Sequence, residues 1–558
     1  MRWLGERRPI LAVDSETTGL SLAKDRIRLV QFGDGMHGWA IPYEEWKGLI
    51  RHVLKVYEGK IALQHAKFDA GFLQREGLPF PWERTHDTMI MSFLADSMGP
   101  KSLKPAAARY VDSRAQAGEQ ELKKAMVRNR WTYATIPIEF PPYWTYSALD
   151  VVLTARLAEF LWPRIQPYRE AYDLELACER VLCDMEMRGV QIDVNYCIEK
   201  RGFLQEEWEK ASAALGDMNP NATRDVVAAL EATGVVLTKR TESGQKAVDD
   251  EVLSALATTG NPIAINVLKA RTYTKLLGTY FDNFLSFHND GILNPHINQL
   301  AARTGRMSVT EPALQTVPRK SLVRDAFIPR EGNRLVLVDY DNQELRVAAH
   351  FSQDERMLEL FREGRNLHME TARRLYGTSS CDHANKCSHY STAKNAMFSK
   401  AYGAGIDKFS RTAGIPHLEA SKVFATLDEL YPGLNRTMAA VTAAVRTRIN
   451  SDGYGYVQLI DGRHLKVRGD KAYVGFNALI QGSCAVVLKR ALVDLDAAGL
   501  GSFLALPIHD EIMFDVPIGE LDEAIPAITE VMTQEDFTIP LTVDSNIVNR
   551  WGDTYRGK

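Results

Sequence analysis

Short apolar runs alternate with helix-like patterns over the first part of the chain. Runs at residues 10–13, 27–32 and 60–63 have the length and β-branched content of buried strands, and apolar residues recur at helical spacing between them. Strands that alternate with helices are typical of α/β domains. We therefore predict an α/β domain over residues 1–165.

The pattern then becomes mostly helical. Apolar residues recur at helical spacing from Leu174 to Met185, and Gly189 is a suitable C-cap before an extended segment at residues 190–193. A second long helical pattern covers residues 266–284. A helical region over residues 166–295 follows.

The last region contains two strand signals, at residues 334–338 and 503–508, with a long helical block between them. A sheet whose strands are separated in this way indicates that one subdomain is inserted within another. Overall we expect a multi-domain protein with α/β and α+β parts.

Length and composition agree with this organisation. A chain of 558 residues is too long for one core, and a 45% hydrophobic and 25% charged composition is that of an ordinary globular protein. Its six cysteines are scattered, which favours a reducing, cytoplasmic compartment over a secreted disulfide framework. No run approaches the ~18 apolar residues of a membrane span, so we expect no membrane contact.

The net charge of −4 does not favour a nucleic-acid partner, because such partners usually select basic surfaces. It does not exclude one either. Carboxylates concentrated in metal sites can make a protein acidic while a local basic groove neutralises phosphates.

The first candidate site is a set of carboxylates in the N-terminal domain. Asp14 and Glu16 lie two apart on a predicted strand and so share a face, and Asp69 follows another strand. Tyr146 and Asp150 lie four apart on a predicted helix. An Asp-x-Glu pair alone would be more typical of a solvated strand edge. Four carboxylates with a tyrosyl hydroxyl, however, are what two-metal phosphodiester hydrolysis requires.

These segments resemble the three motifs of the DEDD exonuclease family in its tyrosine subtype, whose fold is RNase H-like. The resemblance implies 3′→5′ excision from a single-stranded DNA 3′ end, with four carboxylates as Mg²⁺ ligands and a tyrosine that positions the water. The residues concerned are Asp14, Glu16, Asp69, Asp150 and Tyr146. His65 departs from the family, which often has Asn there. The alternative is a retained but inactive domain.

The second candidate site combines two distant segments. The apolar run 334–338 ends at Asp339, and the run 503–508 leads into His509, Asp510 and Glu511 before a further apolar run. The second segment therefore predicts a hairpin with carboxylates at its turn, and the two strands could bring Asp339 and Asp510 together. Asp at one strand end is common by itself.

A helix between these strands carries a cation and two rings. Lys394, Phe398 and Tyr402 lie at i, i+4 and i+8, on one face, before glycines at 403 and 405 end the helix. Such a face can meet a triphosphate with the lysine and a base pair with the rings. The alternative is a mixed stripe packed on a core.

From about Tyr172 to the C-terminus the chain resembles family A DNA polymerases, the family of bacterial polymerase I and phage replicases. DYDNQELRVAAH is similar to motif A of that family, AKNAMFSKAYGAG to motif B and LPIHDEI to motif C. Segments 304–308 and 312–315 are similar to its primer-template segment.

The resemblance implies roles for individual residues. Asp339 and Asp510 would hold two Mg²⁺ ions, for which Mn²⁺ can substitute, and Lys394 and His368 would contact phosphates of the incoming dNTP. Phe398 would lie near its sugar. Three further roles are implied: Tyr402 near the template base, Glu344 in the space of a ribose 2′-hydroxyl, and contacts to primer-template DNA from Arg306, Gln315, Asn477, Gln481 and His509.

The implied architecture is an RNase H-like exonuclease domain followed by a right-hand polymerase. Residues 1–165 would form the exonuclease domain, 166–295 the thumb, 296–353 and 438–558 the palm, and 354–437 the fingers. Accessory replication proteins are further expected partners.

Two positions depart from the polymerase pattern. Tyr390 stands where the family usually has an Arg for the incoming phosphates, so either Lys386 or Lys400 substitutes or nucleotide affinity is weaker. Tyr473 stands where relatives often have an Arg on the primer strand.

Two further features bear on identity. Cys381, His383, Cys387 and His389 are zinc ligand types, but their spacing is not a standard zinc pattern, which favours a loop without metal. The absence of room for a 5′-nuclease domain before Asp14 favours a phage replicative enzyme working in the host bacterial cytoplasm. The rival functions are a single-subunit RNA polymerase, which Glu344 argues against, and a DNA-binding protein with exonuclease activity alone.

Overall fold

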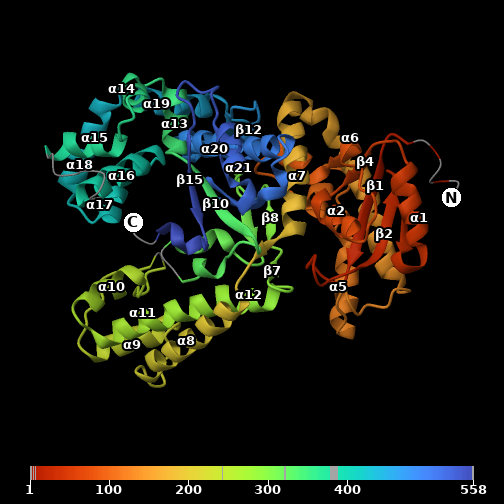
Figure 1. The fold of residues 1–558 in the computed structure, drawn as a ribbon, viewed down its shortest axis with the longest axis horizontal. Helices are drawn as coiled ribbons and strands as arrows, with labels where there is room; N and C mark the ends of the chain where they lie inside the picture. Colours follow the sequence, from red (N-terminus) through yellow and green to blue (C-terminus); the bar gives the residue numbers. More distant parts are fainter. Residues whose placement is uncertain are drawn as a thin grey trace.

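The protein is described by a computed structural model that covers residues 3, 6, 8–241, 243–319, 322–377 and 387–555. Figure 1 shows the N-terminal domain (red and orange) at one end of the molecule and a helical lobe of residues 355–430 (teal) at the other. A helical arm of residues 194–287 (yellow to lime) extends from the central sheet between them.

The N-terminal domain is built on a five-stranded sheet in the order β3-β2-β1-β4-β5. β1 pairs antiparallel with β2 and parallel with β4, so the central strand joins an antiparallel and a parallel half. The strands are β1 (Leu11–Thr17), β2 (Ile27–Gly33), β3 (Gly38–Pro42), β4 (Ile61–Leu63) and β5 (Thr85–Asp87).

Helices cover this sheet. The long helix α6 packs against β1, β2 and β3, because its apolar residues from Val151 to Ile165 form a continuous buried face. The helices are α1 (Tyr43–Val56), α2 (Ala66–Arg75), α3 (Thr88–Ala95), α4 (Leu103–Tyr110), α5 (Ala117–Asn129) and α6 (Pro141–Ile165).

Helix α7 (Arg169–Arg188) joins the N-terminal domain to the remainder of the chain and packs against both α2 and α20 (Gly475–Ala497). It ends at Gly189, whose φ of 63° is the left-handed value that glycine tolerates without strain. The predicted helix end is confirmed.

The helical arm has a small core of its own, which includes Val226, Leu230, Leu253 and Val267. A π-helical turn, Leu276–Phe281, interrupts its last long helix. The arm comprises α8 (Val194–Ala213), α9 (Thr223–Ala232), α10 (Asp250–Thr258), α11 (Pro262–Lys275) and α12 (Asp282–Phe287).

The central sheet has four antiparallel strands in the order β13-β14-β10-β15. Its apolar residues pack on α20 and α21 within the largest buried core. The strands are β10 (Asn333–Tyr340), β13 (Leu504–Ile508), β14 (Glu511–Pro517) and β15 (Val543–Val548), and the covering helices include α13 (Gln343–Ser352) and α21 (Leu521–Met532).

The helical lobe is inserted between β10 and β13, as the sequence predicts. It contains α14 (Glu355–Arg362), α15 (Leu367–Tyr376), α16 (Ser388–Ala401), α17 (Ile406–Ala413) and α18 (His417–Leu430), followed by α19 (Pro432–Thr447) and the hairpin of β11 (Tyr454–Gln458) and β12 (His464–Arg468). No helix among the described residues has the length and apolar character needed to cross a membrane.

A buried carboxyl pair links the N-terminal domain to α7. Asp87 and Glu179 are both fully buried, and Glu179 Oε1 accepts a hydrogen bond from the Lys67 backbone N–H at 3.1 Å. The Glu179 and Asp87 carboxyl groups also hydrogen-bond with each other, which requires a proton between them. Burial, followed by the charge of Asp87, raises the pKa of Glu179 well above its ordinary value.

Replacing Glu179 tests this shared proton. Above the ordinary pKa, the unfolded chain releases a proton that folded Glu179 retains, so this group costs stability as pH rises towards its raised pKa. Glu179→Gln keeps both hydrogen bonds without titrating. We expect its melting temperature to exceed that of the natural chain by an increment that grows as pH rises from about 5 towards the raised pKa of Glu179.

Thermal melts followed by circular dichroism across this range provide the measurement. Glu121→Gln, at an exposed position on α5, is the matched control. Its change in melting temperature relative to the natural chain should be independent of pH. A Glu179→Gln increment that is also constant would contradict a shared proton.

Candidate active sites

Three carboxylates of the N-terminal domain converge on one point. Strand β1 places Asp14 and Glu16 on the same face, and α6 places Asp150 opposite them; one oxygen of each lies within 4.8 Å of the others. Ser147, one turn before Asp150, donates a hydrogen bond to Glu16 at 3.2 Å. The strand and the helix are therefore joined at the cluster.

Asp69 lies beside this cluster on α2. It is 1% exposed and accepts a 2.6 Å hydrogen bond from the hydroxyl of Ser15, the residue between Asp14 and Glu16. Burial, then the charge of Asp14, raises its pKa well above the ordinary value.

Burial also raises the pKa values of Asp14 and Glu16. Burial raises the pKa of Asp14 to about 7 and that of Glu16 to about 8, the latter with a further contribution from the charge of Asp14. Mutually repelling carboxylates of this kind are stabilised by a divalent cation, and oxygen is the ligand atom that Mg²⁺ prefers. The donor set thus fits the predicted metal chemistry.

Tyr146 lies at the same site with a neighbour that the sequence did not indicate. Lys104 on α4 forms an ion pair with Asp150, and its ammonium nitrogen is 4.6 Å from the centre of the Tyr146 ring. Tyr133, from the segment between α5 and α6, hydrogen-bonds with Tyr146. Neither Lys104 nor Tyr133 belongs to a recognisable spacing pattern.

His65, the departure from the exonuclease pattern, precedes α2 in a left-handed conformation with φ of 66°. Its ring contacts that of His296 on β8 (His296–Asn298), with centroids 5.3 Å apart. This residue therefore faces the following part of the chain.

The second site lies at one end of the central sheet. Asp339, near the end of β10, is paired with Glu511 across the β10–β14 ladder, and the Tyr340 N–H donates to the Asp510 carbonyl at 3.3 Å. His509 takes a left-handed conformation, with φ of 60°, in the turn between β13 and β14. The predicted hairpin is present, and its turn lies next to Asp339.

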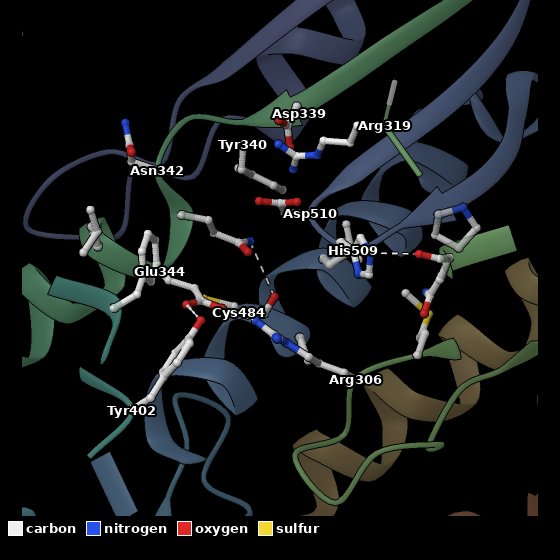
Figure 2. A pocket seen from close by; sticks show the side chains of 18 of the residues that line it. Arg306, Arg319, Asp339, Tyr340, Asn342, Glu344, Tyr402, Cys484, His509 and Asp510 are labelled. Atoms are coloured by element: carbon white, nitrogen blue, oxygen red, sulfur yellow. Dashed lines mark hydrogen bonds and ion pairs between the residues drawn. The ribbon is translucent and has the colours of Figure 1, made fainter. Parts of the chain in front are cut away.

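Asp339 and Asp510 line a cavity of about 430 Å³. Figure 2 shows both carboxylates beside Arg319, with Glu344, Tyr402 and Arg306 further along the same cavity. Among the residues singled out from sequence, those that line it are Arg306, Gln315, Asp339, Glu344, Lys394, Phe398, Tyr402, His509 and Asp510.

The charges around Asp339 favour the binding of a cation. Burial, then the charges of Asp510 and Glu511, raises its pKa to about 8. Its Oδ1 atom is buried without a hydrogen-bond partner. A carboxylate oxygen left unsatisfied next to a second carboxylate fits a divalent ion.

Glu344 is held by two contacts across the cavity. It accepts a 2.7 Å hydrogen bond from the Tyr402 hydroxyl and forms an ion pair with Arg306. Gln481 on α20 in turn hydrogen-bonds with Tyr402. These contacts, visible in part in Figure 2, join α13, the end of α16 and α20.

Lys394, Phe398 and Tyr402 of the cation-and-ring face line the cavity, with Lys394 Nζ 5.9 Å from the centre of the Phe398 ring. His368 lies behind it, only 2% exposed, with both ring nitrogens unpaired. The Tyr390 ring packs on His368 at a centroid distance of 5.8 Å and is itself 9% exposed. Tyr390 therefore fills space and supplies no charge.

The residues predicted to contact DNA are divided between the cavity and helix α20. His509 Nε2 is 3.1 Å from the Gln315 carbonyl oxygen. Asn477 and Gln481, on α20, do not line the cavity, and Asn477 Oδ1 is buried without a partner. Tyr473 lies against Gly403: a Cβ on that glycine would be 2.8 Å from its ring.

Three basic residues are candidates to replace the phosphate-binding Arg that the family usually has at the position of Tyr390. Lys400 forms an ion pair with Asp428 on α18 and does not line the cavity, so it is a poor substitute for the missing Arg. Lys386 lies outside the described residues. Arg319, which the sequence did not single out, lines the cavity and lowers the pKa of Asp339 through its charge.

Of the four Cys and His residues whose spacing favours a loop without zinc, Cys381 and His383 also lie outside the described residues. Cys387 caps α16 by accepting a hydrogen bond from the Tyr390 N–H, and His389 stacks on Tyr376 with ring centroids 4.1 Å apart.

Comparison with known proteins assigns the family. A family model described as DNA polymerase family A matches residues 199–553. This chain belongs to DNA polymerase family A. A second model, described as 3′-5′ exonuclease, matches residues 5–166, so this family member carries an exonuclease domain, as the sequence predicts.

Individual relatives agree with the family models. A DNA polymerase of Mycobacterium phage L5 is 31% identical to this family A chain and aligns with 98% of it and 93% of the relative. A DNA polymerase of Mycobacterium phage D29 is 30% identical and also aligns with 98% of this chain and 93% of the relative.

A solved structure supports the fold. The "POL domain of Pol1 from M. smegmatis complex with DNA primer-template and dNTP" superposes with a TM-score of 0.81 at 23% identity, covering 97% of this chain and 95% of that one. The predicted combination of an exonuclease domain with a polymerase fold is confirmed.

The contact between β3 and α6 yields a prediction for the exonuclease site. A Cβ added at Gly38 would lie 2.0 Å from the Ala148 carbonyl oxygen, on the helix that carries Tyr146 and Asp150. Gly38→Ala should therefore displace α6, lower the free energy of unfolding by about 1–3 kcal/mol and slow excision.

Gly48→Ala, in α1, is the control, because nothing lies within 4 Å of its added Cβ. Denaturant unfolding and release of 3′ nucleotides measure the two effects. If the two variants have the same free energy of unfolding and the same excision rate, the position of α6 does not depend on the contact between Gly38 and Ala148.

Proposed function

We propose that this family A polymerase extends primer-template DNA with dNTPs at Asp339 and Asp510, and removes 3′ nucleotides at Asp14, Glu16, Asp69 and Asp150. The observation that carries the proposal is the buried, unpartnered Oδ1 of Asp339 beside Asp510, in a cavity that also contains Lys394. Cofactors would be Mg²⁺ at each site, with Mn²⁺ able to substitute.

At the polymerase site, Asp339 and Asp510 would hold two metal ions. Such ions supply Lewis acidity, which activates the primer 3′-hydroxyl and neutralises the pyrophosphate leaving group. Lys394 faces the same cavity and would bind the triphosphate and steady its developing charge. Arg319 lies beside Asp339 and would also bind phosphate, in place of the Arg that the family usually has at the position of Tyr390.

Glu344 would select deoxyribonucleotides. Its carboxylate is fixed by Tyr402 and Arg306, so it cannot easily move aside for a ribose 2′-hydroxyl. A rigid carboxylate that clashes with a ribonucleotide and leaves its 2′-hydroxyl without a hydrogen bond weakens ribonucleotide binding. Discrimination then does not require tighter binding of the deoxyribonucleotide.

Contacts to the duplex would come from Arg306, Gln315, Asn477, Gln481 and His509. Amide and basic side chains suit the minor groove, whose degenerate pattern allows any correct base pair to be accepted. His368, buried behind α16, could reach a phosphate only after movement of this helix, which agrees with fingers that close on the nucleotide.

At the exonuclease site, Tyr146 would orient the attacking water, while the carboxylates would hold metal ions that would supply Lewis acidity for phosphodiester hydrolysis. The two sites lie on separate sheets, so the 3′ end must pass from one to the other. The similarity to phage DNA polymerases supports a replicative role in the cytoplasm of a bacterial host, with accessory replication proteins as further partners. The same similarity disfavours the two rival functions, a single-subunit RNA polymerase and a DNA-binding protein with exonuclease activity alone.

Substitution of one carboxylate at each site separates the activities. Asp510→Ala should reduce primer extension at least 10³-fold, on the order expected when a metal ligand is lost, while leaving excision. Asp14→Ala should do the reverse. A labelled primer on a longer template, incubated with Mg²⁺ with and without dNTPs, measures both; loss of both activities in either variant would refute separate sites.

Selectivity against ribonucleotides tests Glu344. Glu344→Ala opens the space for a 2′-hydroxyl, so the ratio of kcat/KM for dNTP to that for rNTP should fall by roughly 10²-fold or more. Glu359→Ala, on the fingers helix α14, is the control. An unchanged ratio in Glu344→Ala would remove the steric role.

A further inference from the structure

The exonuclease site contains a buried cation that does not belong to the metal-ligand set. Lys104 is 6% exposed, forms an ion pair with Asp150, and places its ammonium nitrogen over the Tyr146 ring. Asp14 and Glu16 also act on it electrostatically.

Packing alone does not explain this side chain. Burying a lysine is costly unless a counter-charge repays the lost hydration, and apolar residues of similar volume are often more stabilising. Elsewhere on α4, alanines at 106 and 107 provide the buried contacts. The lysine instead reaches the carboxylate cluster of the N-terminal domain, which indicates a role in that site.

We propose that Lys104 is a positioning residue for 3′→5′ excision. Its ammonium group holds Asp150 and the Tyr146 ring in one arrangement and gives the carboxylate cluster a built-in positive charge. This inference rests on the proposed exonuclease function of the cluster.

Two consequences follow from charge and geometry. Without the ammonium group, Asp14, Glu16 and Asp150 attract a divalent cation more strongly, by roughly tenfold or more at such short range. At the same time Asp150 and Tyr146 lose the group between them, and loss of a supporting contact of this kind slows a metal-dependent reaction by about 10–100-fold. Tighter metal binding with slower excision is not expected of a purely structural residue.

The experiment uses the full chain with Asp339→Asn and Asp510→Asn, so that metal binding reports the exonuclease site. Mn²⁺ affinity is measured by electron paramagnetic resonance, and excision of single-stranded DNA is measured with Mg²⁺. In this background Lys104→Met should bind Mn²⁺ roughly tenfold more tightly. It should excise with a kcat lowered about 10–100-fold and KM little changed.

Two further variants complete the set. Lys104→Arg retains the charge and should restore most of the natural affinity and rate. Lys124→Met removes an exposed lysine from α5 and should match the parent in both measurements. Thermal melting of each variant checks that it is folded.

Unchanged Mn²⁺ affinity in Lys104→Met, unchanged excision, or an Arg variant that behaves like Met would each overturn the proposal. Asp14→Ala distinguishes this failure from failure of the site itself. If Asp14→Ala retains excision, the assignment of the cluster is wrong; if it loses excision while Lys104→Met is normal, only the role of Lys104 is wrong.

Discussion

Repulsion between buried carboxylates is the constraint on which both sites depend. At the proposed polymerase site, the fold brings Asp339 next to Asp510 and Glu511, although burial and like charge together raise the pKa of Asp339 to about 8. At the proposed exonuclease site the same combination raises the pKa of Glu16 to about 8. Each arrangement is held by backbone pairing and packing around it, and divalent cations would relieve the repulsion.

The surroundings of each cluster follow from this constraint. Strands fix carboxylates from one side, as β1 does for Asp14 and β10 for Asp339. The other carboxylates come from helices α2 and α6 at the first cluster, and from the turn between β13 and β14 at the second. Cations lie at the margin: Lys104 beside Asp150, and Arg319 beside Asp339. A chain with a net charge of −4 can thereby present local positive charge to phosphates.

The sequence predicted the parts of the structure that local patterns encode. Asp339 and Asp510 could be placed because buried apolar runs precede both, and Tyr146 and Asp150 because helical spacing puts them on one face. Strands β3 and β15 were not predicted. Both are edge strands whose residues are largely half-exposed or exposed, and polar residues interrupt the apolar pattern of β15.

Residues brought in by tertiary packing were also missed. Lys104 reaches its site only because α4 packs on α6, and Arg319 follows a proline in an irregular segment. The family resemblance supplied the residue roles, since spacing alone left a solvated strand edge and a packed helix face as alternatives. It could not foresee that Tyr390 packs on His368, because that contact depends on the position of α15 against α16.

Anomalous diffraction from crystals of the full chain with primer-template DNA, an incoming nucleotide and Mn²⁺ would test whether Asp339 and Asp510 share metal ions. We expect Mn²⁺ peaks in contact with both Asp339 and Asp510, and further peaks among Asp14, Glu16 and Asp150. A complex with bound nucleotide and no ion touching both Asp339 and Asp510 would show that these two carboxylates do not form a shared metal site.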